Sequence, residues 1–312
     1  MQLFNKTTRI DFMGQRKYAM IFSATLILLS LVSLLARGLN FGIDFTGGTV
    51  VEIGYPQPVD LAKIRSHLES IEFKGAVVQH FGTTRDVLVR LPSQGDLDKA
   101  ELSSRIIREL ETLAATKLDL RRVEFVGPQV GKELTEQGGL AMLIALAAIL
   151  LYVTFRFEYR FALGSVAALI HDVVVTLGFF SIFALEFDLT VLAAILAVIG
   201  YSLNDTIVVF DRIRENFRKI RKGTPLDIIN GSLNQTLART LITSLTTLLV
   251  LTTLFLLGGQ LIHGFSTALI VGIFIGTYSS IYIASTTTLA LGVSKADLMP
   301  VPKEGAELDG RP

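Results

Sequence analysis

Six apolar stretches dominate the sequence, and each is long enough to cross a membrane as a helix. They are 18–36, 138–155, 161–185, 190–210, 240–257 and 265–291. A helix rises about 1.5 Å per residue, so about 20 apolar residues span a hydrocarbon core of about 30 Å. Half of the 312 residues are hydrophobic, which excludes an ordinary soluble domain. The sequence therefore predicts an α-helical integral membrane protein with six transmembrane helices.

Lysine and arginine gather at alternate ends of these stretches and set the expected orientation. They precede 18–36, fill the turn after the second stretch and follow 190–210, whereas the turns 186–188 and 258–264 contain neither residue. Cytoplasmic loops carry the excess of basic residues, so we expect both termini in the cytoplasm. The first stretch resembles a signal peptide, but no small-residue cleavage site follows it, and we expect an uncleaved helix.

These signals divide the chain into regions. They are a cytoplasmic N-terminus 1–17, transmembrane helix 18–36, a periplasmic domain 37–132, transmembrane helices two to six within 133–292, their basic cytoplasmic loop 211–239, and a cytoplasmic tail 293–312. In the basic loop, Thr224 and Pro225 can begin a helix with apolar residues on one face. That helix either lies along the inner membrane surface or packs on protein.

The periplasmic segment has the pattern of a small α+β domain. The expected elements are strand 49–54, helix 58–71, strands 76–81 and 86–91 joined by a turn at 82–85, helix 97–113 and strand 119–126. The order βαββαβ is that of the ferredoxin-like fold, which by itself fixes no activity. Gly47-Gly48 lacks the Lys-Ser/Thr ending of a phosphate loop, so we expect these glycines to let the chain turn.

The sequence gives no indication of enzyme, metal or cofactor chemistry. It contains no cysteine, which excludes disulfides and thiolate metal sites, and its four histidines are scattered. No HExxH or G-x-S-x-G motif occurs in a helix, which counts against an intramembrane protease. The net charge of +1 argues neither for nor against nucleic acid, and no nucleic-acid partner is expected.

One carboxylate lies inside an apolar stretch. Asp205 is about fifteen residues into 190–210, roughly 22 Å along the helix and in the inner half of the bilayer. An ionised carboxylate there costs on the order of a few kcal/mol unless it faces the bundle interior or water. We therefore expect Asp205 to exchange a cation, either a proton or sodium. The alternative is a static carboxylate held by Asn204 or Ser202.

Other charged residues could share this role. Arg239 begins the fifth stretch and is the natural counter-charge, although a snorkelling arginine explains it equally well. His171 and Asp172 lie nearer the bilayer midplane and point about 100° apart on a helix. They form either a proton relay or a buried structural pair. Asp211 borders the basic loop and can pair with Arg214 one turn later, which favours a structural role.

Three sequence blocks together resemble a known family. They are FGIDFTGGTVVEI after the first stretch, GYSLNDTIVVFDRIREN around Asp205, and LARTLITSLTT around Arg239. These blocks are similar to the SecD/SecF family of the bacterial Sec translocase, over about residues 41 to 290. SecD usually shows a GMAVDAN-like block in place of GYSLNDT, so the chain is more similar to the SecF branch.

The resemblance implies a fold, partners and a function. The fold is an RND-like half bundle of six helices with a ferredoxin-like periplasmic domain, in the bacterial inner membrane. The implied partners are SecD, the SecYEG channel, accessory membrane proteins such as YajC and YidC, the translocating polypeptide and membrane lipid. The function is to use the proton-motive force for late steps of polypeptide translocation, without an enzymatic reaction or cofactor. Asp205 and Arg239 match the family's functional aspartate and arginine.

Two other functions are compatible with an intramembrane carboxylate. A stand-alone RND-type proton-coupled small-molecule exporter would normally carry both helical halves in one chain, and this chain has one. A passive scaffold predicts that Asp205 and Arg239 tolerate neutral substitution.

Overall fold

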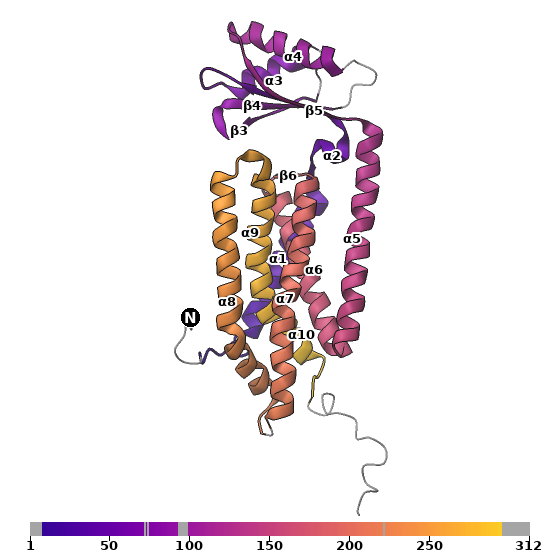
Figure 1. Ribbon diagram of the computed structural model, residues 1–312, viewed down its shortest axis with the longest axis vertical. Coiled ribbons are helices and arrows are strands. Elements are labelled where there is room, and N and C mark those ends of the chain that lie inside the picture. Colours follow the sequence, from indigo (N-terminus) through magenta and orange to yellow (C-terminus); the bar gives the residue numbers. More distant parts are fainter. Residues whose placement is uncertain (1–7, 72, 74, 93–98, 221, 295–312) are drawn as a thin grey trace, which may run out of the picture.

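A computed structural model of the chain describes residues 8–71, 73, 75–92, 99–220 and 222–294 (Figure 1). A long helical bundle carries a small α+β domain at one end. We call this domain, residues 48–126, the cap domain, and the bundle end beside it the cap end. Residues 1–7 of the expected N-terminal segment, 295–312 of the expected tail, and the start of the helix expected at 97–113 lie outside the described residues.

Six helices of the described chain are long and apolar enough to cross a membrane. They are α1 (Arg16–Arg37), α5 (Pro128–Arg156), α6 (Tyr159–Ile182), α7 (Leu189–Lys219), α8 (Pro225–Leu257) and a last helix made of η1 (Gln260–Ile262), α9 (His263–Ser279), the π-helical η2 (Ser280–Ala284) and α10 (Ser285–Ala290). Each overlaps one predicted stretch, although α5 and α8 begin well before the stretches 138–155 and 240–257. The predicted six-helix membrane fold is confirmed.

The helices α6, α7 and the last helix form the centre of the bundle. In the most apolar part of each of these three helices, 56% of the residues are buried. The corresponding values are 17% for α1, 6% for α5 and 17% for α8. A Cβ on Gly272 would lie 2.2 Å from Val198, so the backbone of α9 approaches α7 closely. This is the packing expected of the small-residue pair Gly272 and Gly276. The outer helices leave apolar faces uncovered, as helices that face lipid or another membrane subunit do.

The cap domain has the predicted βαββαβ order. Its elements are β2 (Gly48–Gly54), α3 (Leu61–Ser70), β3 (Val77–Phe81), β4 (Thr83–Leu91), α4 (Lys99–Ala114) and β5 (Asp119–Val126). The strands form one antiparallel sheet in the order β3-β4-β2-β5, as in ferredoxin-like units. The turn expected at 82–85 is tighter, because Gly82 adopts a φ of 81° and Phe81 already pairs with Thr83.

The sheet lies between its own helices and the bundle (Figure 1). On the outer face, Leu68 of α3 and Ile106 of α4 are fully buried with Val89 of β4 in one apolar cluster. The opposite face of the sheet turns towards the cap end of the bundle. Any movement of the cap domain therefore changes the space between this sheet face and the bundle.

Two adjoining glycines turn the chain from the membrane part into the sheet. After α2 (Ile43–Thr46), Gly47 and Gly48 adopt φ angles of 67° and 131°. A Cβ on Gly48 would lie 2.3 Å from the carbonyl oxygen of Leu91. Side chains rarely adopt such φ values, so the glycine pair makes the turn, as predicted from the sequence.

A short ladder that the sequence did not predict ties the end of α1 to the turn between α6 and α7. β1 (Asn40–Phe41) pairs in parallel with β6 (Glu186–Phe187). The backbone N–H of Gly42 also donates to the carbonyl oxygen of Phe187 at 2.9 Å. Strands of two residues are too short to show a hydrophobic period. This ladder fixes the start of the cap domain on the bundle.

The segment expected as a basic loop, 211–239, is mostly helix. α7 and α8 cover all of it except residues 220–224. The first part of α8 is the short helix expected after Thr224. Its Ile229 is fully buried, and the Asn234 side chain exchanges hydrogen bonds of 2.8 Å with the backbone of Ile10. This part of α8 therefore packs on protein, which was one of the two alternatives.

Candidate functional site

Asp205 lies in the interior of the bundle. It is 2% exposed, and the hydroxyl of Ser244 on α8 donates to its Oδ2 at 3.4 Å. Ser244 is hydrogen-bonded in turn to Thr277 of α9 at 2.7 Å. Within the described residues, neither Asn204 nor Ser202 bonds to this carboxylate, although the sequence suggested both as holders. Within the described residues, the direct partner of Asp205 is therefore the neutral hydroxyl of Ser244, which is bonded in turn to α9.

The buried face of α7 sets this position. Its buried residues recur at steps of three and four, and they include Val198, Ser202, Asp205, Thr206 and Val209. The helical period places such residues on one side. Asp205 thus lies on the mainly apolar face of α7 that packs against the rest of the bundle, so its carboxylate points into the bundle.

Arg239 lies near Asp205 without pairing with it. No ion pair joins the two side chains in the described structure, although the charge of Arg239 acts on Asp205 across the gap. The arginine is exposed and lines a cavity of about 340 Å³ beside Asn204, Asp211 and Glu215. This cavity lies in the half of the bundle away from the cap domain. The cavity therefore gives the Arg239 side chain polar surroundings, and one of its lining residues, Asn204, directly precedes Asp205 in the chain.

His171 and Asp172 form a second buried polar cluster. Both are 1% exposed, and His171 Nδ1 lies 2.9 Å from Asp172 Oδ1. The hydroxyls of Ser202 on α7 and Ser279 on α9 donate to Asp172 Oδ2 at 2.5 and 2.8 Å. Asp172 therefore faces α7 and α9, and His171 is hydrogen-bonded to Asp172, its neighbour on α6, although the two side chains leave the helix about 100° apart.

Asp211 lies in an ion-pair cluster at the bundle end away from the cap. Both of its carboxylate oxygens accept hydrogen bonds from Arg156 at 2.9 Å, and Arg214 lies 3.7 Å away. The pairing with Arg214 was expected from the sequence, whereas Arg156 comes from the end of α5. The arrangement fits a structural contact between α5 and α7 better than an ion-coupling role.

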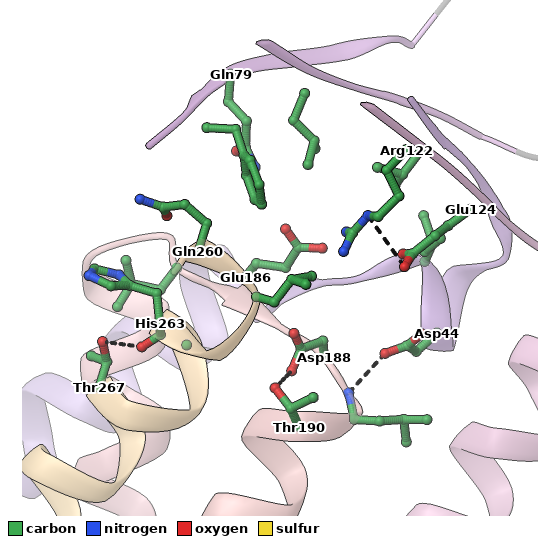
Figure 2. A pocket seen from close by; sticks show the side chains of 18 of the residues that line it. Asp44, Gln79, Arg122, Glu124, Glu186, Asp188, Thr190, Gln260, His263 and Thr267 are labelled. Atoms are coloured by element: carbon green, nitrogen blue, oxygen red, sulfur yellow. Dashed lines mark hydrogen bonds and ion pairs between the residues drawn. The ribbon is translucent and has the colours of Figure 1, made fainter. Parts of the chain in front are cut away.

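A cavity of about 580 Å³ separates the cap-domain sheet from the bundle. Polar side chains line it from both sides (Figure 2), and the labelled ones include Gln79, Arg122, Glu124, Asp44, Glu186, Asp188, Gln260 and His263. Arg122 pairs within the sheet with Glu124 at 3.4 Å. The sequence analysis did not predict this space, because its walls come from segments far apart in the chain.

An ion pair holds the cap domain beside this cavity. Arg90 of β4 lies 2.6 Å from Glu186 of β6 and donates to the carbonyl oxygen of Phe41 at 3.0 Å. Burial raises the pKa of the Glu186 carboxyl above its ordinary value; Asp188 and Asp44 add to the rise, and Arg90 opposes it. The cost of burying the carboxylate thus outweighs the attraction of its partner.

We expect acidification to strengthen the contact between the cap domain and the bundle. A carboxyl whose pKa is raised on docking binds its proton more tightly in the docked state. The stabilisation grows as the pH falls through the raised pKa and is complete below about 4.3, the ordinary value for glutamate. Since the chain has no cysteine, spin labels introduced at Thr112 and Leu257 would report the distance between α4 and the end of α8 as a function of pH.

Glu186→Gln is the matched variant for this measurement, because it keeps the shape of the side chain and cannot ionise. It should show the same distance at every pH. A wild-type cap domain that moves away from the bundle on acidification would show that the ion pair, rather than the burial cost, dominates the contact.

The sequence matches two profiles of one family. "Protein export membrane protein SecD/SecF, C-terminal" matches residues 106–294, and "SecD/SecF GG Motif" matches residues 32–59. The first match alone covers more than half of the chain. The chain belongs to the SecD/SecF family.

Individual family members are similar over their whole length. The protein translocase subunit SecF of Vibrio alginolyticus is 54% identical over 313 residues, which cover 100% of this chain and 99% of that protein. The subunit of the same name from Pseudomonas aeruginosa is 50% identical, over 98% and 99% of the two chains. The resemblance inferred from the three sequence blocks is confirmed.

Solved structures of the family have the same fold. The crystal structure of SecDF, a translocon-associated membrane protein from Thermus thermophilus, gives a TM-score of 0.83 at 40% identity over 93% of this chain. SecDF in a super-membrane-facing form gives 0.70 at 39% identity. This chain spans 39% of the length of each of those chains, so it corresponds to one part of them.

The site contains residues that the sequence analysis missed. Ser244 and Ser279 were not predicted as carboxylate partners, and only their polarity within apolar stretches could have indicated them. Ser202 was suggested as a partner of Asp205 and instead donates to Asp172. Among the described residues, no cluster of three or more His, Asp or Glu side chains is placed to hold a metal ion. The candidate site of this family member is thus a pair of buried carboxylates surrounded by hydroxyl groups.

Proposed function

We propose that this chain pairs with SecD and uses the proton-motive force to drive late steps of polypeptide translocation across the bacterial inner membrane. The observation that carries the proposal is Asp205, a carboxylate buried among three helices with only hydroxyl partners. Without a bound cation, such an anion is costly inside a bilayer. The names of its relatives, protein translocase subunit SecF and SecDF, supply the translocation context.

The proposed orientation places the cap domain in the periplasm and both termini in the cytoplasm. It is supported by the basic residues at the bundle end away from the cap, such as Arg156, Arg212 and Arg214, and by the positive-inside rule. In this orientation, the cavity beside Arg239 lies on the cytoplasmic side and the cavity under the sheet lies on the periplasmic side.

The proposed cycle moves one cation through the bundle. The cation arrives from the periplasm, binds Asp205, and leaves towards the cytoplasm through the cavity lined by Arg239. The fixed positive charge of Arg239 favours the ionised carboxylate and so promotes release. Neutralising Asp205 changes its bonds to Ser244 and thereby the packing of α7 on α8. Such a change can bias a bundle with two arrangements.

The proposed partners follow the family context. SecD would contribute six further helices and cover uncovered apolar faces of this bundle. The SecYEG channel, with accessory proteins such as YajC and YidC, would supply the translocating polypeptide to the periplasmic side. Asp172 and Asp211 belong to the proposal as weaker candidates, Asp172 for the relay and Asp211 at its cytoplasmic border.

The function is tested by export of a secreted reporter from membrane vesicles that contain the chain, SecD and the channel. The proton gradient and the sodium gradient are varied separately after translocation has begun. We expect the late phase to slow when the proton gradient alone is removed, and not when the sodium gradient alone is removed. Late export that is independent of both gradients would contradict the proposal.

A further inference from the structure

The cluster around His171 and Asp172 has bonds that define how its protons are arranged. Asp172 receives the hydroxyls of Ser202 and Ser279 on one oxygen and His171 Nδ1 on the other. When Asp172 is ionised, its carboxylate only accepts hydrogen bonds, and Nδ1 then carries the imidazole hydrogen. The other ring nitrogen, Nε2, then presents a bare lone pair.

This Nε2 atom is buried and has no hydrogen-bond partner among the described residues. An unpaired buried acceptor costs free energy. The negative charge of Asp172 adds to that cost, because the nearest described partners of the cluster are neutral. A proton on Nε2 makes His171 an imidazolium beside the Asp172 carboxylate, so the two residues become an ion pair without net charge. Removal of the net negative charge from the buried cluster favours uptake of one proton at this atom.

The titratable groups around the cluster are few. Tyr278 of α9 lies nearest, with its ring centroid 6.2 Å from that of His171; its hydroxyl is bonded to Ser23 of α1 and donates to Ala19. Other titratable residues of the packed helices near this level are Tyr282 of η2 and Tyr201 and Asp205 of α7. The remaining charged or titratable residues of these helices lie towards their ends, such as Arg16, Lys17, Tyr18 and Arg37 of α1, Asp211 of α7 and His263 of α9. Asp205 bonds towards α8 instead.

The two carboxylates act on the same pair of helices. Ser202 and Asp205 are one turn apart on α7, and Thr277 and Ser279 are two residues apart on α9. Asp172 accepts hydrogen bonds from Ser202 on α7 and Ser279 on α9. Thr277 on α9 is bonded to Ser244, which donates to Asp205. No hydrogen bond joins the two clusters directly in the described chain. Coupling between them therefore runs through the relative position of α7 and α9.

The backbone of the last helix changes type at this level. Directly after Ser279, residues Ser280–Ala284 form a π-helical segment, and Thr206 of α7 donates to the Ser280 hydroxyl at 3.1 Å. π-helical turns inside α-helices are frequent at functional sites. A segment of this kind can change its hydrogen bonding without unfolding the helix.

We propose that His171 and Asp172 form a second proton-binding station of the bundle, with His171 Nε2 as the accepting atom. Proton uptake there weakens the bonds from Ser202 and Ser279 to Asp172 and loosens α7 against α9. The station takes a proton and not sodium, because hard cations prefer oxygen ligands and the free atom is an imidazole nitrogen. The inference rests on the proposed gradient-driven function and adds a second proton-binding site.

The direct test is nitrogen NMR of the full chain in lipid nanodiscs, with labelled imidazole rings. We expect His171 Nε2 to gain a proton as the pH is lowered from 9 to 5, and Asp172→Asn to displace that transition. His263→Asn, which changes a histidine of the cap-end turn, identifies one of the three other histidine signals and should leave the transition in place. An Nε2 that stays bare, or stays protonated, across the whole range overturns the inference.

The functional test uses His171→Asn, which keeps a nitrogen donor near the position of Nδ1 and lacks Nε2. We expect gradient-driven export to fall about tenfold and to lose its dependence on pH between 6 and 8, since proton uptake no longer biases the helices. Ser202→Ala removes the bond by which Asp172 holds α7, so the pH dependence should also weaken in this variant. If His171→Asn keeps the wild-type pH profile while Asp205→Asn abolishes coupling, the second station is wrong and the proposed function stands.

Discussion

Asp205→Asn is expected to remove most of the gradient-driven part of export, by as much as about fifty-fold at a potential of 100 mV. Moving one elementary charge across 100 mV is worth about 2.3 kcal/mol, and about 1.4 kcal/mol changes an equilibrium tenfold. The amide cannot ionise, so this contribution is lost. Its oxygen still accepts the hydroxyl of Ser244, and the bundle should fold and assemble with SecD. The measurement is the late rate of reporter export with and without a proton gradient.

Asp211→Asn is the matched control for this variant. Asp211 lies on the same helix, but it is partly exposed and already paired with Arg156. Exposed ion pairs contribute little, about 0 to 1 kcal/mol, so the variant should keep its response to the gradient. Asp205→Asn with a normal gradient response would show that the buried carboxylate is static. An equal loss in both variants with normal assembly would assign Asp211 to the relay as well, whereas an equal loss with poor assembly would point to general damage of α7.

The sequence was informative where a pattern is local. Six apolar stretches fix six helices, because in a bilayer the backbone polar groups must be satisfied within the segment. The alternation in the cap domain likewise predicts four strands and two helices in the right order. Asp205 was also identifiable from local sequence, because it is a carboxylate within the apolar stretch 190–210, where an ionised side chain is costly. These features depend on residues close together in the chain.

Contacts between distant segments could not be predicted. The ion pair between Arg90 and Glu186 joins a strand of the cap domain to the turn between two membrane helices. The serines around Asp172 come from α7 and α9, and serine is common in membrane helices for packing reasons alone. Arg239 illustrates the same limit, because its depth left open whether it pairs with Asp205, and no ion pair joins these two described side chains. Side-chain partners depend on helix rotation, which a single sequence does not fix.

Gly48→Ala is expected to destabilise the cap domain by about 3 kcal/mol or more. A strained φ costs a non-glycine residue on the order of 1–3 kcal/mol, and here the added Cβ would also lie 2.3 Å from the carbonyl oxygen of Leu91. That oxygen belongs to β4, the neighbour of β2 in the sheet, so relief of the clash requires the two strands to separate. The measurement is amide hydrogen exchange of β2 and β4 in the full chain.

Gly75→Ala separates the two causes, because Gly75 also has a positive φ, 80°, but a Cβ there would meet only Pro92 at an ordinary 3.5 Å. This variant carries the conformational cost of about 1–3 kcal/mol alone, and the difference between the two variants measures the close approach of Gly48 to β4. Equal protection of β2 in both variants would mean that the chain relaxes around position 48. The glycine pair would then act as a flexible joint, and the attachment of the cap domain would depend on contacts such as the β1–β6 ladder and the Arg90–Glu186 pair.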